Sequence, residues 1–228
     1  MRRLWADPAW AGVRFCLLGR DPVKLQALTD EGAALGVVCQ ALALDMLDPS
    51  ACVLALQRLA ELPPVLGFAL VAGLNHDHSI AKLSEEEWDQ VWQVNVGFHA
   101  QLLWALHQPG RLAPGARGIL VGSIVGLRGN HGQTAYAAAK GALLDLLPCS
   151  PPGLRLNVLL PPLVPSPLLS KLSPEAHERL FSTRLLPDPD PAHSCAEAGA
   201  FLLSDSAAYI HRQAVHADSR VGADPFFL

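Results

Sequence analysis

Short apolar segments alternate with helix-like segments along most of this chain. Parallel strands need helical crossovers between them, and a sheet covered on both faces needs strands that are apolar throughout. The alternation therefore predicts an α/β fold with a doubly wound parallel sheet, in three layers α/β/α. A chain of 228 residues fits one such domain, spanning residues 1–228. The expected strands cover residues 13–18, 37–44, 65–71, 118–122, 154–160 and 214–217.

The clearest helix begins after Ser84. Glu87 stands three residues later and completes a capping box, and apolar side chains then recur on one stripe as far as residue 106. Asn95 falls on that stripe. Further helices are expected at residues 135–147 and 192–203. The proline-rich segment 161–191 is expected to form a flap over a binding site, with a short helix at residues 173–181.

Composition and charge exclude several classes of protein. The basic residues are scattered and the formal net charge is −4, which argues against a nucleic-acid-binding surface. No apolar run reaches the ~18 residues of a membrane span, and polar residues and a proline interrupt any signal peptide near the start. The cysteines are odd in number and contain no C-x-x-C pair, which favours reduced, mostly buried thiols and a cytoplasmic protein. They are Cys16, Cys39, Cys52, Cys149 and Cys195.

Tyr136 and Lys140 have the spacing Y-x-x-x-K, and Ser123 ends an apolar strand thirteen residues before the tyrosine. Residues four apart lie one turn above each other on a helix face. The Lys140 ammonium is therefore expected beside the phenol, where it lowers a pKa that is ~10 in model peptides. With Ser123 holding a carbonyl oxygen, these groups form a proton donor for carbonyl reduction. The alternative is an ordinary half-buried tyrosine and a solvated lysine.

The context of this motif resembles the short-chain dehydrogenase/reductase family, which has a Rossmann-type fold. The resemblance rests on S-x12-Y-x-x-x-K, on Q-V-N-V-G-F around Asn95 and on the ending Y-I-H-R-Q, and it is most similar to the 3-oxoacyl-acyl-carrier-protein reductases. It implies a catalytic set of Asn95, Ser123, Tyr136 and Lys140. In that set Tyr136 gives the proton, and Asn95 holds a water that connects Lys140 to solvent. The alternative for Asn95 is a hydrogen-bonded core residue, because a buried amide without partners costs ~1–3 kcal/mol.

Arg20 closes the first expected strand, where a fold of this type binds the adenosine ribose. The charge and forked donors of arginine suit a 2′-phosphate, so NADP(H) is favoured over NAD(H). The alternative assigns Asp21 to a helix cap and leaves Arg20 on the surface. By the resemblance, the further cofactor-binding residues are Asp45, Ala72, Gly73, Tyr136, Lys140 and Ser166.

One element of the family does not occur in this sequence. No strand followed by T-G-x-x-x-G-x-G, the turn that binds the pyrophosphate, precedes Arg20. In the family that strand lies between the second and fourth strands, so its absence leaves two strands with unpaired edges and exposed apolar faces. Two explanations compete: a true start about 25–30 residues upstream, or a truncated relative with altered function.

The expected function is NADP(H)-dependent reduction of a ketone or 3-oxoacyl-type carbonyl to a secondary alcohol. The expected partners are a small-molecule or acyl-carrier-linked substrate and further copies of the chain, as a dimer or tetramer, although the segment after Tyr136 is shorter than in the family. Neither nucleic acid nor a membrane is an expected partner. No metal is expected either, since the sequence His76-Asp77-His78 has no third ligand at regular spacing. The alternative is a catalytically impaired relative with an interaction or regulatory role.

Overall fold

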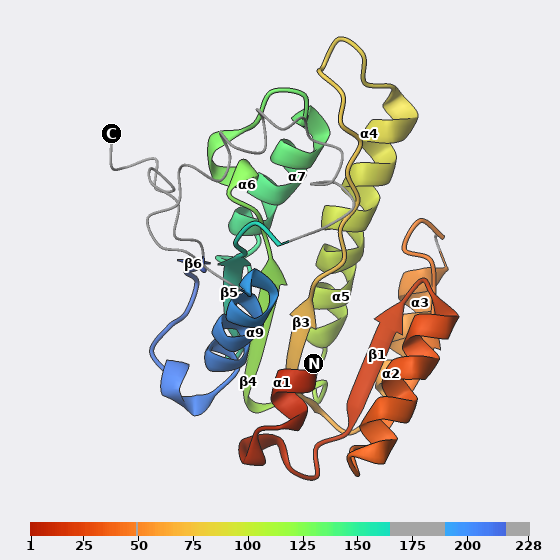
Figure 1. Cartoon of the computed structure of the whole chain (residues 1–228), viewed down its shortest axis with the longest axis vertical. Helices are drawn as coiled ribbons and strands as arrows, with labels where there is room; N and C mark the ends of the chain where they lie inside the picture. The colour runs from red at the N-terminus through yellow and green to blue at the C-terminus, as the bar shows by residue number, and fades with distance from the viewer. Residues whose placement is uncertain (49, 165–189, 218–228) are drawn as a thin grey trace.

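The computed structural model describes residues 1–48, 50–164 and 190–217, and confirms the α/β fold (Figure 1). All six expected strands are present. They are β1 (Phe15–Gly19), β2 (Cys39–Ala43), β3 (Val65–Leu70), β4 (Leu112–Val121), β5 (Arg155–Leu160) and β6 (Ala214–His216). Every strand pairing is parallel. The α-helices are α1 (Arg2–Trp5), α2 (Pro22–Ala34), α3 (Ala51–Ala60), α4 (Glu85–Trp92), α5 (Phe98–Leu106), α6 (Val125–Arg128), α7 (Thr134–Asp145) and α9 (Pro191–Leu202).

Helices cover both faces of the larger sheet, and the side chains of β4 alternate between two apolar clusters. Leu120 packs with Phe98 of α5 and Leu143 of α7 on one face. Ile119 packs with Leu202 of α9 on the other face. Burial of these side chains, at roughly 1.5–3 kcal/mol each, holds the helices that carry the site against the strand ends.

The strands form two sheets instead of one. β1 pairs with β2, and β3, β4, β5 and β6 follow one another in a second sheet. Among the described residues, the facing edges of β1 and β3 have no strand partner. The Phe15 amide donates to Val38, and the Leu44 amide donates to Gly19. Because backbone groups alternate in direction along a parallel strand, those of Cys16 and Leu18 point to the unpaired edge.

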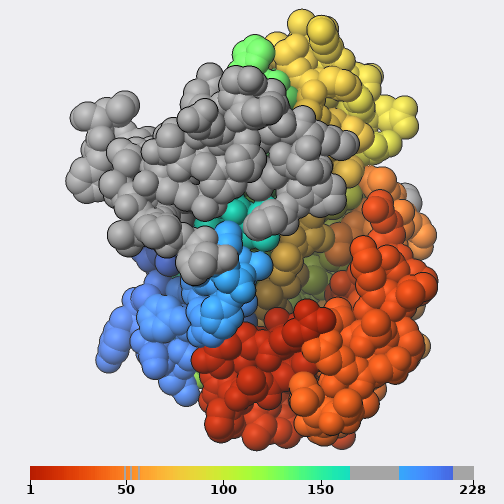
Figure 2. Space-filling model, in the orientation of Figure 1, coloured from red at the N-terminus to blue at the C-terminus, as the bar shows by residue number. Residues whose placement is uncertain are grey.

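Exposure follows from this division. β5 lies between two strands, and its last five residues are all buried. β3 has one strand neighbour, and Leu66 is 37% exposed on it. Val71, directly after β3, is 63% exposed. Figure 2 shows the surface hollowed between the N-terminal segments and β3. The division lies where the sequence analysis expects two strands with unpaired edges.

Helix α1 connects elements from the two sheets. Arg2 forms an ion pair with Glu31 on α2 at 2.6 Å, and Arg3 forms one with Glu197 on α9 at 2.5 Å. Exposed ion pairs of this kind each stabilise a protein by about 0–1 kcal/mol. The indole of Trp5 lies beside Gly32 of α2 and adds an apolar contact.

The long helix after Ser84 is interrupted, which corrects the expectation of a continuous helix. The capping box is confirmed, since Ser84 accepts from the Glu87 amide and Glu87 accepts from the Ser84 amide. Between α4 and α5, however, residues Gln93–Gly97 form a π-helical turn. The Asn95 side chain donates to the Val91 carbonyl at 2.8 Å, a bond that competes with the regular backbone ladder.

The flap at 161–191 and its helix at 173–181 fall largely on residues outside the described part. Cys16, Cys39 and Cys195 are partly exposed and Cys149 is exposed, so the expectation of mostly buried thiols is wrong for these four, which are all free. Within the described ranges, no helix is long and apolar enough to cross a membrane.

Candidate active site

Three separate elements bring the four expected catalytic residues together. Ser123 lies two residues after the end of β4, and Asn95 lies in the π-helical turn. Tyr136 and Lys140 lie on α7, which packs against both α6 and the π-helical turn. Parallel strands end at a common edge, so the loops after β3 and β4 meet at this helix.

The Lys140 ammonium is buried beneath the tyrosine. The side chain is 3% exposed, and Nζ lies 5.7 Å from the centroid of the Tyr136 ring. Nζ donates to the carbonyl of Val121 at 2.8 Å. Burial lowers the pKa of Lys140 from 10.5 to about 8, so the side chain is still charged at neutral pH. The solvated-lysine alternative is therefore wrong.

The expected lowering of the Tyr136 pKa is not observed. Burial raises the pKa of the phenol above its ordinary value of 10, a hydrogen bond with Ser123 lowers it, and the negative charge of Asp77 raises it further. Removal of the phenol from water outweighs any effect of Lys140, whose ammonium lies over the ring and hydrogen-bonds to a backbone carbonyl. Tyr136 is thus a neutral phenol at physiological pH, which is the form that can give a proton.

Asn95 is fully buried and faces the same centre. Its Nδ2 donates to the carbonyls of Leu74, at 2.7 Å, and Val91. Its Oδ1 has no hydrogen-bond partner among the described residues. The core-residue alternative therefore accounts for the amide nitrogen but leaves the oxygen unexplained.

Gly73 lies between these groups. A Cβ at this position would stand 3.0 Å from Asn95 Oδ1 and 3.4 Å from Lys140 Nζ. A side chain here would fill the space in front of both polar atoms. Gly73 after β3 therefore lies beside two of the candidate catalytic residues, Asn95 and Lys140.

Gly126 on α6 fixes the distance between α6 and α7. A Cβ at Gly126 would lie 2.6 Å from the carbonyl carbon of Lys140 and 2.7 Å from the amide nitrogen of Gly141. Only glycine allows this approach without a shift of backbone. The short helix after Ser123 is therefore held directly against the turn that carries Lys140.

The other expected cofactor-binding residues follow β1 and β2. Arg20 is exposed directly after β1, and no hydrogen bond or ion pair from its side chain is found within the described residues. Asp21 caps α2 by accepting from the amides of Val23 and Lys24, so that part of the alternative is confirmed. Asp45 is exposed two residues after β2 and accepts from the Leu47 amide at 3.0 Å. Ser166 lies outside the described residues.

Asp77 has a structural role that no motif in the sequence indicated. Its Oδ1 accepts from Gln133 at 2.8 Å and from Asn75 at 2.7 Å, so it joins the loop after β3 to the start of α7. Beside it, His78 pairs with Glu87 at 3.0 Å. Among the described residues, no group of His, Cys, Asp or Glu side chains is arranged to hold a metal ion. The only sequence signal was the polar loop containing Asp77.

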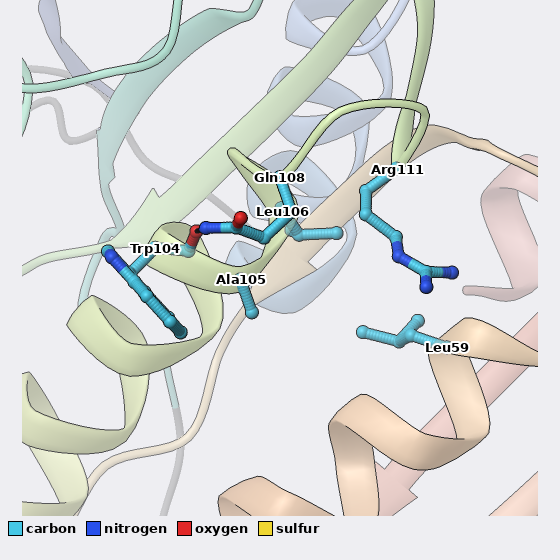
Figure 3. Close-up of a pocket in the computed structure, with 6 residues that line it drawn as sticks. All are labelled: Leu59, Trp104, Ala105, Leu106, Gln108 and Arg111. Atoms are coloured by element: carbon cyan, nitrogen blue, oxygen red, sulfur yellow. Dashed lines mark hydrogen bonds between the residues drawn. The ribbon is translucent and has the colours of Figure 1, made fainter.

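A cavity of about 190 Å³ lies at the opposite end of the sheet (Figure 3). It is lined by Leu59 at the end of α3, by the end of α5 and by Arg111, which directly precedes β4. Since the four catalytic candidates gather at the carboxyl ends of the strands, this cavity at the start of a strand is not part of their site.

Comparisons with known proteins match most of the chain, and the family model matches nearly all of it. A family model described as enoyl-(acyl carrier protein) reductase matches residues 9–219. The 3-oxoacyl-(acyl-carrier-protein) reductase FabG of Escherichia coli (strain K12) is 29% identical over 197 residues, which are 84% of this chain and 80% of that protein. The (3R)-3-hydroxyacyl-CoA dehydrogenase of Rattus norvegicus is 31% identical over 146 residues, which are 61% of this chain and 56% of that protein.

A solved structure of similar shape is the 3-oxoacyl (acyl-carrier-protein) reductase from Agrobacterium tumefaciens C58 with NADP bound. It superposes with a TM-score of 0.81 at 23% identity, over 93% of this chain and 86% of that chain. At this identity the match supports the fold alone.

Proposed function

Because this chain belongs to the short-chain dehydrogenase/reductase family of oxidoreductases, we propose that it reduces a ketone of 3-oxoacyl type to a secondary alcohol, with NADPH as the reductant. The names of its Escherichia coli and rat relatives support an acyl-thioester substrate, carried by a carrier protein or by coenzyme A. The observation that carries the proposal is the neutral, half-buried Tyr136 phenol above the buried Lys140 ammonium.

NADPH, when bound, supplies the hydride to the carbonyl carbon. Ser123 donates a hydrogen bond to the carbonyl oxygen and stabilises the charge that develops there. Tyr136 gives its proton to the same oxygen. Lys140 stabilises the resulting phenolate by its charge, and Asn95 keeps a polar path from Lys140 toward solvent. Below its pKa of about 8, Lys140 is charged and can do this.

The residues present fit NADP(H) on the ribose side. Gly73 leaves open the space in front of Lys140 Nζ, and the ammonium has donors to spare beyond its bond to Val121. The exposed guanidinium of Arg20 is available to a 2′-phosphate and favours NADP(H) over NAD(H). We propose Asp45, Ala72, Tyr136 and Ser166 as further cofactor-binding residues on the family pattern.

A catalytically impaired relative is the second candidate, and the divided sheet favours it. The unpaired edges of β1 and β3 flank the place where the family binds the pyrophosphate. This alternative predicts a folded protein that binds neither nicotinamide nucleotide.

We also propose that the chain forms a homo-oligomer. Trp92 and Trp104, on α4 and α5, are 39% and 66% exposed, and large exposed aromatic side chains are typical of protein interfaces. Light scattering coupled to gel filtration would measure the mass, and a monomer at micromolar concentration would contradict this part of the proposal.

The function is tested by Tyr136→Phe, with NADPH consumption followed in the presence of a 3-oxoacyl thioester. Removal of the acid is expected to lower the rate at least about 100-fold while the melting temperature stays close to that of the parent protein. Tyr209→Phe is a matched control, since Tyr209 is fully exposed and is the only other tyrosine in the sequence. Equal rates for the parent protein and Tyr136→Phe would refute the assignment.

A further inference from the structure

His99 is a buried imidazole beneath the proposed site, and the mechanism above does not use it. It is the second residue of α5 and is 1% exposed. Its Nδ1 lies 2.6 Å from the backbone carbonyl oxygen of Asn95. A carbonyl oxygen can only accept, so Nδ1 carries the hydrogen and Nε2 is left with a lone pair.

This hydrogen bond stabilises the π-helical turn. In a regular α-helix the carbonyl of Asn95 accepts the amide of residue 99; here the same oxygen also accepts from the imidazole of His99, which ties the π-helical turn to the first turn of α5. The side chain of Asn95 is held at its other end by Leu74 and Val91. His99 and these two carbonyls together fix the orientation of Asn95.

Several unmet hydrogen-bonding groups lie around this turn. His99 Nε2 and Asn95 Oδ1 are buried acceptors without a partner among the described residues. Lys140 Nζ has three hydrogens, and its described partner is the Val121 carbonyl. A Cβ at Gly73 would lie 3.0 Å from Asn95 Oδ1 and 3.4 Å from Lys140 Nζ, so these two groups face the same small space. The positive charge of Lys140 also contributes to the lowered pKa of His99. Two buried acceptors beside an ammonium with donors to spare are the surroundings that hold an ordered water.

We propose that His99 is a positioning residue for Lys140: its Nδ1–H fixes the turn that carries Asn95, and its Nε2 accepts a hydrogen bond from a buried water that solvates the Lys140 ammonium. The proposal rests on the proposed function. His99 transfers no proton in this scheme, because burial and the nearby Lys140 charge lower its pKa to about 4 and the ring stays neutral at physiological pH. Among the described residues, the charge that affects the pKa of His99 is that of Lys140 on α7, and the charge that affects the pKa of Tyr136 is that of Asp77.

The first test does not depend on activity. Long-range ¹⁵N–¹H spectra of the full chain with labelled histidine report the tautomer and hydrogen bonding of each imidazole, and the spectrum of His99→Gln identifies the signals of His99. The proposal expects the His99 ring to stay neutral down to pH 5 with its hydrogen on Nδ1. The ¹⁵N chemical shift of Nε2 should be that of an unprotonated nitrogen that accepts a hydrogen bond, upfield of a free one. An Nε2–H tautomer, an ordinary titration near pH 6.5, or a free Nε2 would overturn it.

The second test is the pH dependence of reduction. The rate should fall as pH rises through the Lys140 pKa, since a neutral amine cannot stabilise the phenolate. His99→Leu removes both hydrogen bonds and should move this fall to lower pH by about one unit, at unchanged KM. His99→Gln, which keeps a donor and an acceptor, should restore part of the shift. Identical profiles for all three proteins would refute the role of His99.

The two tests separate the failure of this inference from the failure of the proposed function. An inactive parent protein would remove the function, while the spectra would still decide how His99 is bonded. An active parent protein with an unshifted His99→Leu profile would leave the function intact and reject the positioning role.

Discussion

The buried His99 imidazole makes the stability of this protein sensitive to mild acid. Its pKa falls from the ordinary 6.5 to about 4 in the folded state, mainly because burial disfavours the charged ring. The unfolded chain therefore binds a proton at a higher pH than the folded one. The contribution of His99 to stability is fully present above pH 6.5 and is lost as pH falls from 6.5 to 4.

The size of this effect follows from the shift. A change of about 2.5 pKa units at about 1.4 kcal/mol each gives roughly 3 kcal/mol in full, of which about 2 kcal/mol is lost between pH 7 and pH 5. Urea unfolding at both pH values would measure it. In His99→Gln this part of the pH dependence should disappear, whatever the change in stability at pH 7.

His107→Gln is the matched control, because His107 is an exposed imidazole at the end of the same helix. It should keep the pH dependence of the parent protein. If His99→Gln also kept it, His99 would not be held neutral by burial, and the argument from its environment would be refuted.

Three further substitutions test the site. Arg20→Gln should weaken NADPH binding about tenfold and leave NADH binding unchanged, as measured by fluorescence titration; equal losses for both would contradict the 2′-phosphate role. Gly73→Ala should lower the reduction rate by about tenfold or more, since the new Cβ would lie 3.0 Å from Asn95 Oδ1. Gly19→Ala is the control, because its Cβ would make an ordinary contact of 3.5 Å with the Leu25 side chain and should leave the rate unchanged. Gly126→Ala should lower the free energy of unfolding, measured in urea, by about 1–3 kcal/mol, because its Cβ would meet backbone atoms of Lys140. An unchanged free energy of unfolding would show that α6 is not held against α7.

The strands were predictable because apolar runs in a parallel sheet are continuous. In β5, five consecutive buried residues leave little ambiguity. The start of β4 was placed six residues late, because Pro114, Gly115 and Arg117 do not resemble a buried strand; the register shift against β3 near Gly67 accommodates this segment. The unpaired edges beside β1 and β3 followed from the absence of the glycine-rich strand in the sequence.

The electrostatics and the π-helical turn were not predictable from spacing. Y-x-x-x-K placed Lys140 beside Tyr136 correctly, but the direction of the Tyr136 pKa shift depends on burial, which spacing does not encode. In the π-helical turn, the Asn95 side chain donates to the carbonyl of Leu74, which is distant in the sequence, and the Asn95 carbonyl accepts from His99. A periodic stripe of apolar residues carries no signal of either contact.

The most direct test of the central claim is a calorimetric titration of this 228-residue chain with NADPH, and with NADH alongside. A site built from Arg20, Gly73 and Lys140 predicts saturable binding of NADPH that is at least about tenfold tighter than that of NADH. A folded chain that binds neither nucleotide would contradict the proposed reductase and support the catalytically impaired relative.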